Sequence, residues 1–137
     1  MQVFAIIAML VVACLATVAA RAQDAWPSRQ VNLLVPYPAG GYIDAVTRLV
    51  AEGMREKFGQ PFVVLNRVGG NGQVALGDVS RAAPDGYTLL IGDAPHTINV
   101  HVLRHVPYDP IRDFTAITLL ASAPQALVIN PGLPMQN

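Results

Sequence analysis

The turn Pro38-Ala39-Gly40-Gly41 has the composition of an anion-binding site. It follows an apolar run and precedes a helical pattern that begins at about Ile43. Glycine lets a ligand approach the backbone closely, and a helix N-terminus presents unpaired N–H groups and a partial positive charge. Such a junction can bind a carboxylate without a cationic side chain. From the spacing alone, a plain strand–helix turn without a ligand explains these residues equally well.

Asp44 lies in or near the first turn of that helix. Capping the helix or stabilising its dipole is one role for an aspartate in this position. The alternative is a ligand role, in which the carboxylate orients the turn or accepts a hydrogen bond from a ligand amine or hydroxyl.

Other chemistry has little support in the sequence. His96, His101 and His105 are spaced so that the last two could share a helical face, but no cysteine or glutamate accompanies them and Pro107 is close. We therefore expect ordinary polar histidines and no metal site. The chain contains no G-x-S-x-G, no complete G-x-G-x-x-G and no phosphate-binding G-x-x-x-x-G-K-[ST], so we expect no catalytic residue and no cofactor.

The elements that would position the turn alternate along the chain. Period and branched-residue content predict strands at residues 31–35, 61–65, 87–91, 114–120 and 126–129. Helices are expected at 43–58 and 74–83, and a short one at 97–103. The first helix would bury an apolar stripe of Val46, Leu49, Val50, Met54 and Phe58.

An alternating order of strands and helices predicts an α/β fold with parallel pairing and helices covering the sheet. Ligands bind beyond the carboxyl ends of parallel strands. The loops 36–43, 66–72 and 92–97 should therefore lie at one edge of the sheet. Of these, the loop 66–72 is more simply explained as a flexible loop, whereas His96 in the third loop could contact an anion.

Composition and the N-terminal segment bear on location. The chain of 137 residues has a formal net charge of zero, which gives no electrostatic case for nucleic-acid binding.

The N-terminal segment has the pattern of a signal peptide. Residues 3–20 carry no charge, and Ala20-Arg21-Ala22 fits signal-peptide cleavage before Gln23. We expect export to the periplasm, with a lipid anchor through Cys14 and an uncleaved membrane anchor as alternatives. After cleavage no cysteine remains for a disulfide or a zinc site.

Four stretches together resemble the Bug family, the periplasmic substrate-binding receptors of tripartite tricarboxylate transporters. They are Trp26-Pro27-Ser28-Arg29 with Val35–Gly41 and Asp44; Asn66-Arg67 before a glycine-rich loop; Ala83–Leu90; and Tyr108-Asp109-Pro110 with Asp113, Phe114 and Ile117. They follow the family's order and spacing across nearly all of the chain after residue 22. The sequence departs from the family at Val68, at Gly70-Asn71-Gly72, at Ala116 and at Asp93, where small residues, Thr or Ser are usual.

The resemblance implies a three-layer fold with a parallel or mixed sheet, the first part of a type II periplasmic-binding-protein clamshell. Residues 1–22 would be the signal peptide, 23–130 an incomplete first lobe and 131–137 the start of a crossover to a second lobe. Such receptors are about twice as long, in keeping with two domains, so we expect a truncated copy.

The implied function is binding of a small carboxylate by a monomeric, non-enzymatic receptor that delivers it to the membrane subunits of the transporter. The implied ligand-binding residues are Tyr37, Pro38, Ala39, Gly40, Gly41, Asp44, Asp93, Ala94 and His96. A carboxylate at Asp93 would repel a carboxylate ligand unless it points away or pairs with a ligand amine. Two alternatives remain open: a small exported α/β hydrolase, which would need Ser122 near His96, and a fragment without function.

Overall fold

The computed structural model describes residues 25–124, 126 and 128–130 of the chain. The predicted signal peptide at 1–22, Cys14 and the predicted crossover at 131–137 lie outside the described residues. None of the helices in the described part combines the length and apolar character that a membrane crossing requires.

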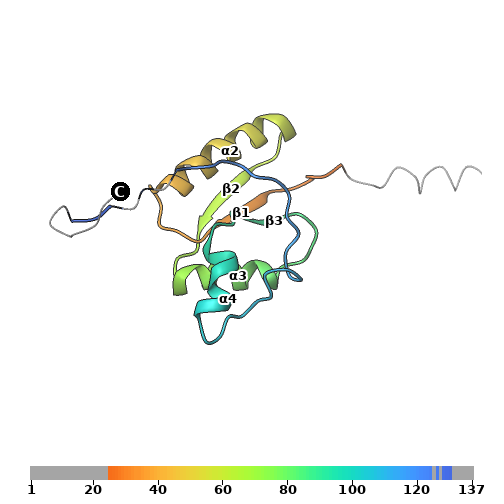
Figure 1. The fold of residues 1–137 in the computed structure, drawn as a ribbon. Coiled ribbons are helices and arrows are strands. Elements are labelled where there is room, and N and C mark those ends of the chain that lie inside the picture. The colour runs from red at the N-terminus through yellow and green to blue at the C-terminus, as the bar shows by residue number, and fades with distance from the viewer. Residues whose placement is uncertain (1–24, 125, 127, 131–137) are drawn as a thin grey trace, which may run out of the picture.

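Three short parallel strands form the centre of the molecule (Figure 1). They are β1 (Val31–Val35), β2 (Phe62–Asn66) and β3 (Thr88–Leu90), in the spatial order β2-β1-β3. The central strand pairs with both neighbours, Leu33 lying opposite Val64 on one side and Leu89 on the other. The predicted α/β class, the parallel pairing and these three strands are confirmed, each within one residue or two of the expected bounds.

The helices cover both faces of this sheet. Helix α2 (Tyr42–Phe58) packs against β2 and β1, whereas α3 (Gln73–Ser80) packs against β3 and β1. A short 3-10 turn, η1 (Gly70–Gly72), precedes α3, and α4 (Pro95–Val102) follows β3. Figure 1 shows α2 on one side of the strands and α3 with α4 on the other, which is the expected three-layer arrangement.

The predicted apolar stripe of α2 is only partly buried: Met54 packs against the core, and Val46 and Val50 are half-buried. Its buried residues are Asp44, Thr47 and Ala51, whereas Leu49 is 76% exposed. Thr47 tolerates burial because its hydroxyl donates to the carbonyl of Ile43 at 2.6 Å. The carboxylate of Asp44 is also hydrogen-bonded inside the protein, so two polar residues outside the predicted stripe are buried on this helix.

An aromatic cluster closes the end of the sheet opposite the carboxyl ends of the strands. The ring of Trp26 lies edge-on to Phe58 and Phe62, with centroids 5.6 and 6.5 Å away, and contacts Tyr87 at 6.3 Å. The guanidinium of Arg29 lies 3.9 Å from the centroid of the Tyr87 ring. These contacts attach the segment before β1 to the sheet.

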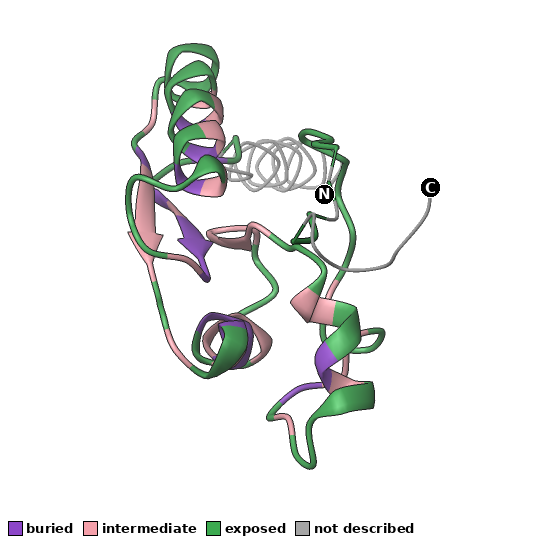
Figure 2. Cartoon of the chain, turned by 60° about the vertical axis from the view of Figure 1, so that its left-hand side comes forward, coloured by how far each residue is buried: buried purple, intermediate pink, exposed green. Residues whose placement is uncertain are grey.

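The strands predicted at 114–120 and 126–129 are wrong for the described residues. Residues 114–124, 126 and 128–130 adopt no regular structure there, and the chain after α4 is mostly exposed (Figure 2). Ile117 and Leu119 are 75% and 83% exposed. Their alternation with small polar residues has the period of a strand, but a strand also needs a hydrogen-bonded neighbour. Residues 114–124 pair with none of the three described strands.

Candidate ligand-binding edge

The loops that follow β1, β2 and β3 meet at the carboxyl edge of the sheet, as predicted. The amide of Arg67, just after β2, donates to the carbonyl of Val35 at the end of β1 at 2.8 Å. A Cβ added at Gly72 would lie 3.3 Å from Pro36 and 4.0 Å from Pro95, so the three loops are in contact. Helices α2, α3 and α4 all begin at this edge.

The Pro38–Gly41 turn leads directly into α2. Gly40 has φ +86°, a left-handed conformation that side chains disfavour. Gly41 is the N-cap without any side-chain capping bond, and the first helical hydrogen bond runs from the amide of Ala45 to the carbonyl of Gly41 at 3.0 Å. The amides of Tyr42 and Ile43 therefore have no partner within the helix. The turn and Tyr42 are exposed and Ile43 is half-buried, so the start of the helix lies at the surface.

Asp44 is buried beneath the turn, with 2% of its surface exposed. One carboxylate oxygen accepts from the amide of Gly40 at 2.9 Å, and both accept from the guanidinium of Arg48, at 2.9 and 3.0 Å. The side-chain amide of Asn66 also donates to the carboxylate, at 2.9 Å. The carboxylate thus fixes the backbone of the turn from inside.

These hydrogen bonds hold the pKa of Asp44 far below its usual range. The largest cause is the bonded guanidinium of Arg48, followed by the amide of Gly40 and the side chain of Asn66. The same ion pair raises the pKa of Arg48. Asp44 is consequently ionised at neutral pH, and its charge is neutralised locally rather than directed at the exposed face of the turn.

Arg48 and Asn66 hold this edge together, although the sequence pattern does not assign them to the candidate site. Asn66 donates to the carbonyl of Tyr37 as well as to Asp44, both at 2.9 Å, so it ties the end of β2 to the turn after β1. The guanidinium of Arg48 also reaches the side-chain oxygen of Asn66 at 3.3 Å. The i, i+4 spacing of Asp44 and Arg48 was a signal in the sequence for one of these contacts.

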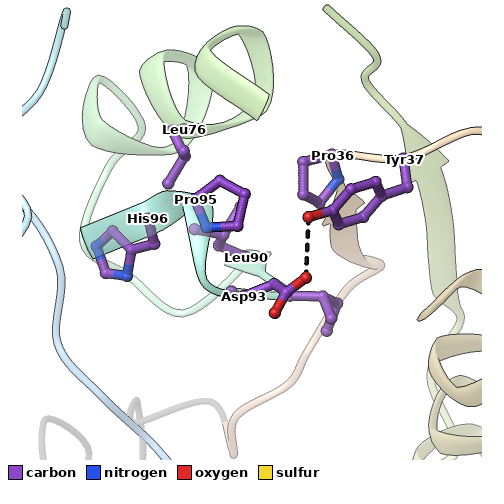
Figure 3. Close-up of a pocket in the computed structure, with 9 residues that line it drawn as sticks. Pro36, Tyr37, Leu76, Leu90, Asp93, Pro95 and His96 are labelled. Atoms are coloured by element: carbon purple, nitrogen blue, oxygen red, sulfur yellow. Dashed lines mark hydrogen bonds between the residues drawn. The ribbon is translucent and has the colours of Figure 1, made fainter. Parts of the chain in front are cut away.

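Tyr37 and Asp93 join the first and third loops. The Tyr37 hydroxyl donates to Asp93 Oδ2 at 2.9 Å (Figure 3). Burial and this bond raise the pKa of Tyr37 to about 12, so the hydroxyl keeps its proton. Both residues line a small surface pocket, together with Pro36, Leu76, Leu90, Ile91, Gly92, Pro95 and His96.

Ala94 and His96 have different positions at this edge. The amide of Ala94 donates to Asp93 Oδ1 at 2.6 Å, and the amide of His96 to the carbonyl of Asp93 at 2.9 Å, so both backbones shape the start of α4. The His96 ring, however, extends away from Tyr37 and Asp93 (Figure 3). It packs against Phe114 and Tyr108, with ring centroids 4.6 and 6.2 Å away.

The loop 66–72 is fixed rather than merely flexible. Asn71 and Asn99 exchange two hydrogen bonds: the Asn71 side chain donates to Asn99 Oδ1 at 2.7 Å, and the Asn99 side chain donates to the Asn71 carbonyl at 2.9 Å. Asn99 is fully buried in α4. This pair locks the second loop onto the helix that follows the third.

Two kinds of site considered from the sequence, a metal site and a Ser122–His96 pair, can be compared with the described residues. The part of the chain that was searched holds no group of three or more His, Cys, Asp or Glu side chains that could bind a metal ion. Nor does a hydrogen bond join Ser122 to His96 in it, and the His96 Nε2 atom is buried without a partner. The hydrolase alternative therefore has no observation in its favour.

Comparison with known proteins identifies relatives of the chain. Residues 46–137 match the model of the tripartite tricarboxylate transporter family receptor. The chain is 33% identical over 116 residues to protein BugT of Bordetella pertussis, covering 83% of this chain and 36% of that protein. It is 39% identical over 115 residues to a protein of Pseudomonas sp. strain P51, covering 82% and 34%. The chain thus spans about a third of the length of these relatives.

Solved structures show the same fold. MatC of Rhodopseudomonas palustris with bound malate superposes with a TM-score of 0.66 at 38% identity, covering 69% of this chain and 33% of that one. The periplasmic binding protein BugD gives a TM-score of 0.62 at 38% identity, covering 65% and 30%. An R. palustris protein with adipate, Rpa4515, gives 0.55 at 42% identity, covering 62% and 29%.

Proposed function

Because the chain belongs to the tripartite tricarboxylate transporter receptor family, we propose that it forms the carboxylate-binding edge of a periplasmic solute receptor. One observation carries the proposal: the amides of Tyr42 and Ile43 at the start of α2 are free of helical partners and lie behind an exposed glycine turn. Backbone donors at a helix N-terminus suit a carboxylate.

The relatives support this ligand class. Malate and adipate, with which two of the similar structures were solved, are both dicarboxylates. In this chain one carboxylate would accept from the amides at the start of α2, and the rest of the ligand would lie over the carboxyl edge of the sheet, beside the hydrogen-bonded Tyr37 and Asp93. The buried Asp44 would act indirectly, since its hydrogen bond to Gly40 holds the turn in its binding conformation. The function is binding, without a catalytic step or a cofactor.

We further propose that residues 23–130 belong to the first lobe of a clamshell and that 131–137 begin the crossover to a second lobe. The signal peptide at 1–22 would direct the protein to the periplasm, with acylation of Cys14 as the alternative. The loaded receptor, a monomer, would then pass its ligand to the membrane subunits of the transporter after hinge closure. Mass spectrometry of the mature N-terminus distinguishes free Gln23 from an acylated Cys14.

The exposed turn provides one wall of a binding site, so we expect weak binding by this chain alone. Amide chemical shifts of the ¹⁵N-labelled chain, titrated with malate or adipate, test the proposal. The expected result is a saturable shift at Gly41, Tyr42 and Ile43, in the millimolar range. The matching neutral diamides should produce none, because they lack the negative charge that the helix N-terminus favours. Shifts absent from this turn, or equal for the diamides, would contradict the proposal.

A further inference from the structure

We propose that the site selects a carboxylate carrying an ammonium group, and that Asp93 makes this selection. The inference rests on the proposed function, because it concerns the ligand of the same sheet edge. It starts from the charge of Asp93, which no cationic side chain pairs with in the part of the chain that the structure describes. The ion pairs found among the described residues engage Asp44, Glu52, Asp78, Asp85 and Asp109 with arginines, and none involves Asp93.

Asp93 is instead held by neutral donors. Tyr37 donates to one carboxylate oxygen and the amide of Ala94 to the other. Two such bonds orient the carboxylate but leave its negative charge and further lone pairs at the wall of the pocket. This contrasts with Asp44 at the same edge, where Arg48 neutralises the charge through two hydrogen bonds.

The Tyr37 hydroxyl adds a second acceptor. Since its proton is directed to Asp93, the oxygen presents lone pairs to other donors. Tyr37 immediately precedes the Pro38–Gly41 turn, so the acceptors on Tyr37 and Asp93 lie at the same carboxyl edge of the sheet as the backbone donors at the start of α2. The edge therefore has a donor part and an acceptor part. A ligand with a carboxylate and a nearby ammonium group matches both.

Electrostatics favours the same ligand. A dianion without a donor places negative charge near the uncompensated carboxylate of Asp93, whereas an ammonium group supplies the missing positive charge. For charges separated by several ångströms near a protein surface, this difference corresponds to roughly tenfold in affinity. Succinate, malate and aspartate form a matched series, because they differ only in the hydrogen, hydroxyl or ammonium group on one carbon.

The test is a titration of the ¹⁵N-labelled chain with these three ligands, following the amides of Gly41, Tyr42 and Ile43. We expect aspartate to bind most tightly and succinate most weakly, about tenfold apart. Asp93→Asn keeps an oxygen that can accept from Tyr37 but removes the charge, so it should abolish the preference by strengthening succinate and weakening aspartate. Asp85→Asn is the matched control, because it removes the same charge before β3, at the opposite end of that strand, and should leave the preference intact.

The outcomes separate the two proposals. Saturable binding of all three ligands with succinate equal to or tighter than aspartate would overturn the selection by Asp93 and leave the carboxylate site standing. A preference that survives in Asp93→Asn, or that is lost equally in Asp85→Asn, would also overturn it. Failure of every ligand to shift the turn amides would overturn both. Retained amide dispersion in each variant shows that the fold is intact.

Discussion

Asp44 and Arg48 form a two-pronged ion pair one helical turn apart, with the carboxylate buried and the guanidinium half exposed. The carboxylate also accepts from the amide of Gly40, four residues before it, and from Asn66 at the end of β2. A single side chain therefore connects the turn, the first helix and the neighbouring strand. The shape of the exposed turn depends on this buried connection.

Asp44→Asn should destabilise the chain. An asparagine keeps only one of the two accepting oxygens, so its NH2 group would face donors that now bond the other oxygen. The Arg48 guanidinium would also lose its charged partner beside a buried site. We expect the thermal unfolding midpoint to fall by about 5 °C or more, measured by circular dichroism. Glu52→Gln is the matched control, since it breaks an exposed pair with Arg55 on the same helix and should change the midpoint by no more than about 2 °C. Equal effects of the two variants would refute a special role for Asp44.

The same carboxylate should make stability depend on acid pH. Its pKa in the folded chain lies far below the usual value, so the unfolded state binds more protons as the pH falls below about 4. Its contribution is complete above that pH and is lost progressively as the pH falls toward the folded pKa. Urea unfolding midpoints between pH 5 and 2.5 should fall steeply for the native chain and less steeply for Asp44→Asn. Glu52 and Asp109, whose pKa values are also lowered by hydrogen bonds from Arg55 and from the amides of Arg112 and Ile111, contribute to the slope that remains. Parallel slopes for the two proteins would rule out Asp44 as a source.

The buried pair of Asn71 and Asn99 should contribute to stability through the second loop. Asn99→Ala leaves the Asn71 carbonyl and side-chain amide without their partners inside the protein, at a cost of about 1–3 kcal/mol in the free energy of unfolding. Urea denaturation measures this cost, and hydrogen exchange should show faster opening of α4. Ile98→Ala, at a neighbouring half-exposed position, should change stability by only about 0.5 kcal/mol. A loss at Ile98 as large as that at Asn99 would point to helix packing instead.

The sequence predicted the parts of the edge that depend on local pattern. The apolar run at β1, the prolines and glycines after it and the amphipathic helix from Tyr42 have local signals, and their alternating order implied parallel strands with adjacent loops. Contacts between distant residues had no such signal. Asn66 with the Tyr37 carbonyl, and Tyr37 with Asp93, depend on the loops being brought together by the sheet.

The predicted strand at 114–120 and the expected role of Asp44 differ from the structure for the same reason, because both depend on contacts with distant residues. Residues 114–120 have the composition of a strand, yet pairing requires a partner that periodicity does not reveal. The position of Asp44 at the start of a helix predicts a cap or a ligand group, because aspartate there normally serves one of these roles. Its burial depends on Arg48 and Asn66 together, and only the first of these has the spacing that a helix makes predictable.

Alanine at Gly40 and alanine at Gly41 should affect the free energy of unfolding and the ligand affinity in opposite order. Gly40 has φ +86°, so Gly40→Ala strains the backbone although the added Cβ meets no atom within 4 Å, and we expect a loss of about 1–2 kcal/mol in unfolding free energy. Gly41 has an ordinary φ of −77°, and an added Cβ would only touch the Pro38 carbonyl oxygen at 3.7 Å. Gly41→Ala should therefore cost only about 0.5 kcal/mol, as expected at an N-cap.

For binding, the order of the two variants should reverse. The methyl group of Gly41→Ala lies at the start of α2, where it limits the approach of a carboxylate to the amides of Tyr42 and Ile43. Gly40→Ala keeps these amides uncovered, and its own amide is already bonded to Asp44. Titration with malate, followed by the Tyr42 and Ile43 amide shifts, should show weaker binding by Gly41→Ala than by Gly40→Ala. If Gly40→Ala, the less stable variant, also bound malate more weakly than Gly41→Ala, the backbone donors of α2 would not be what holds the ligand.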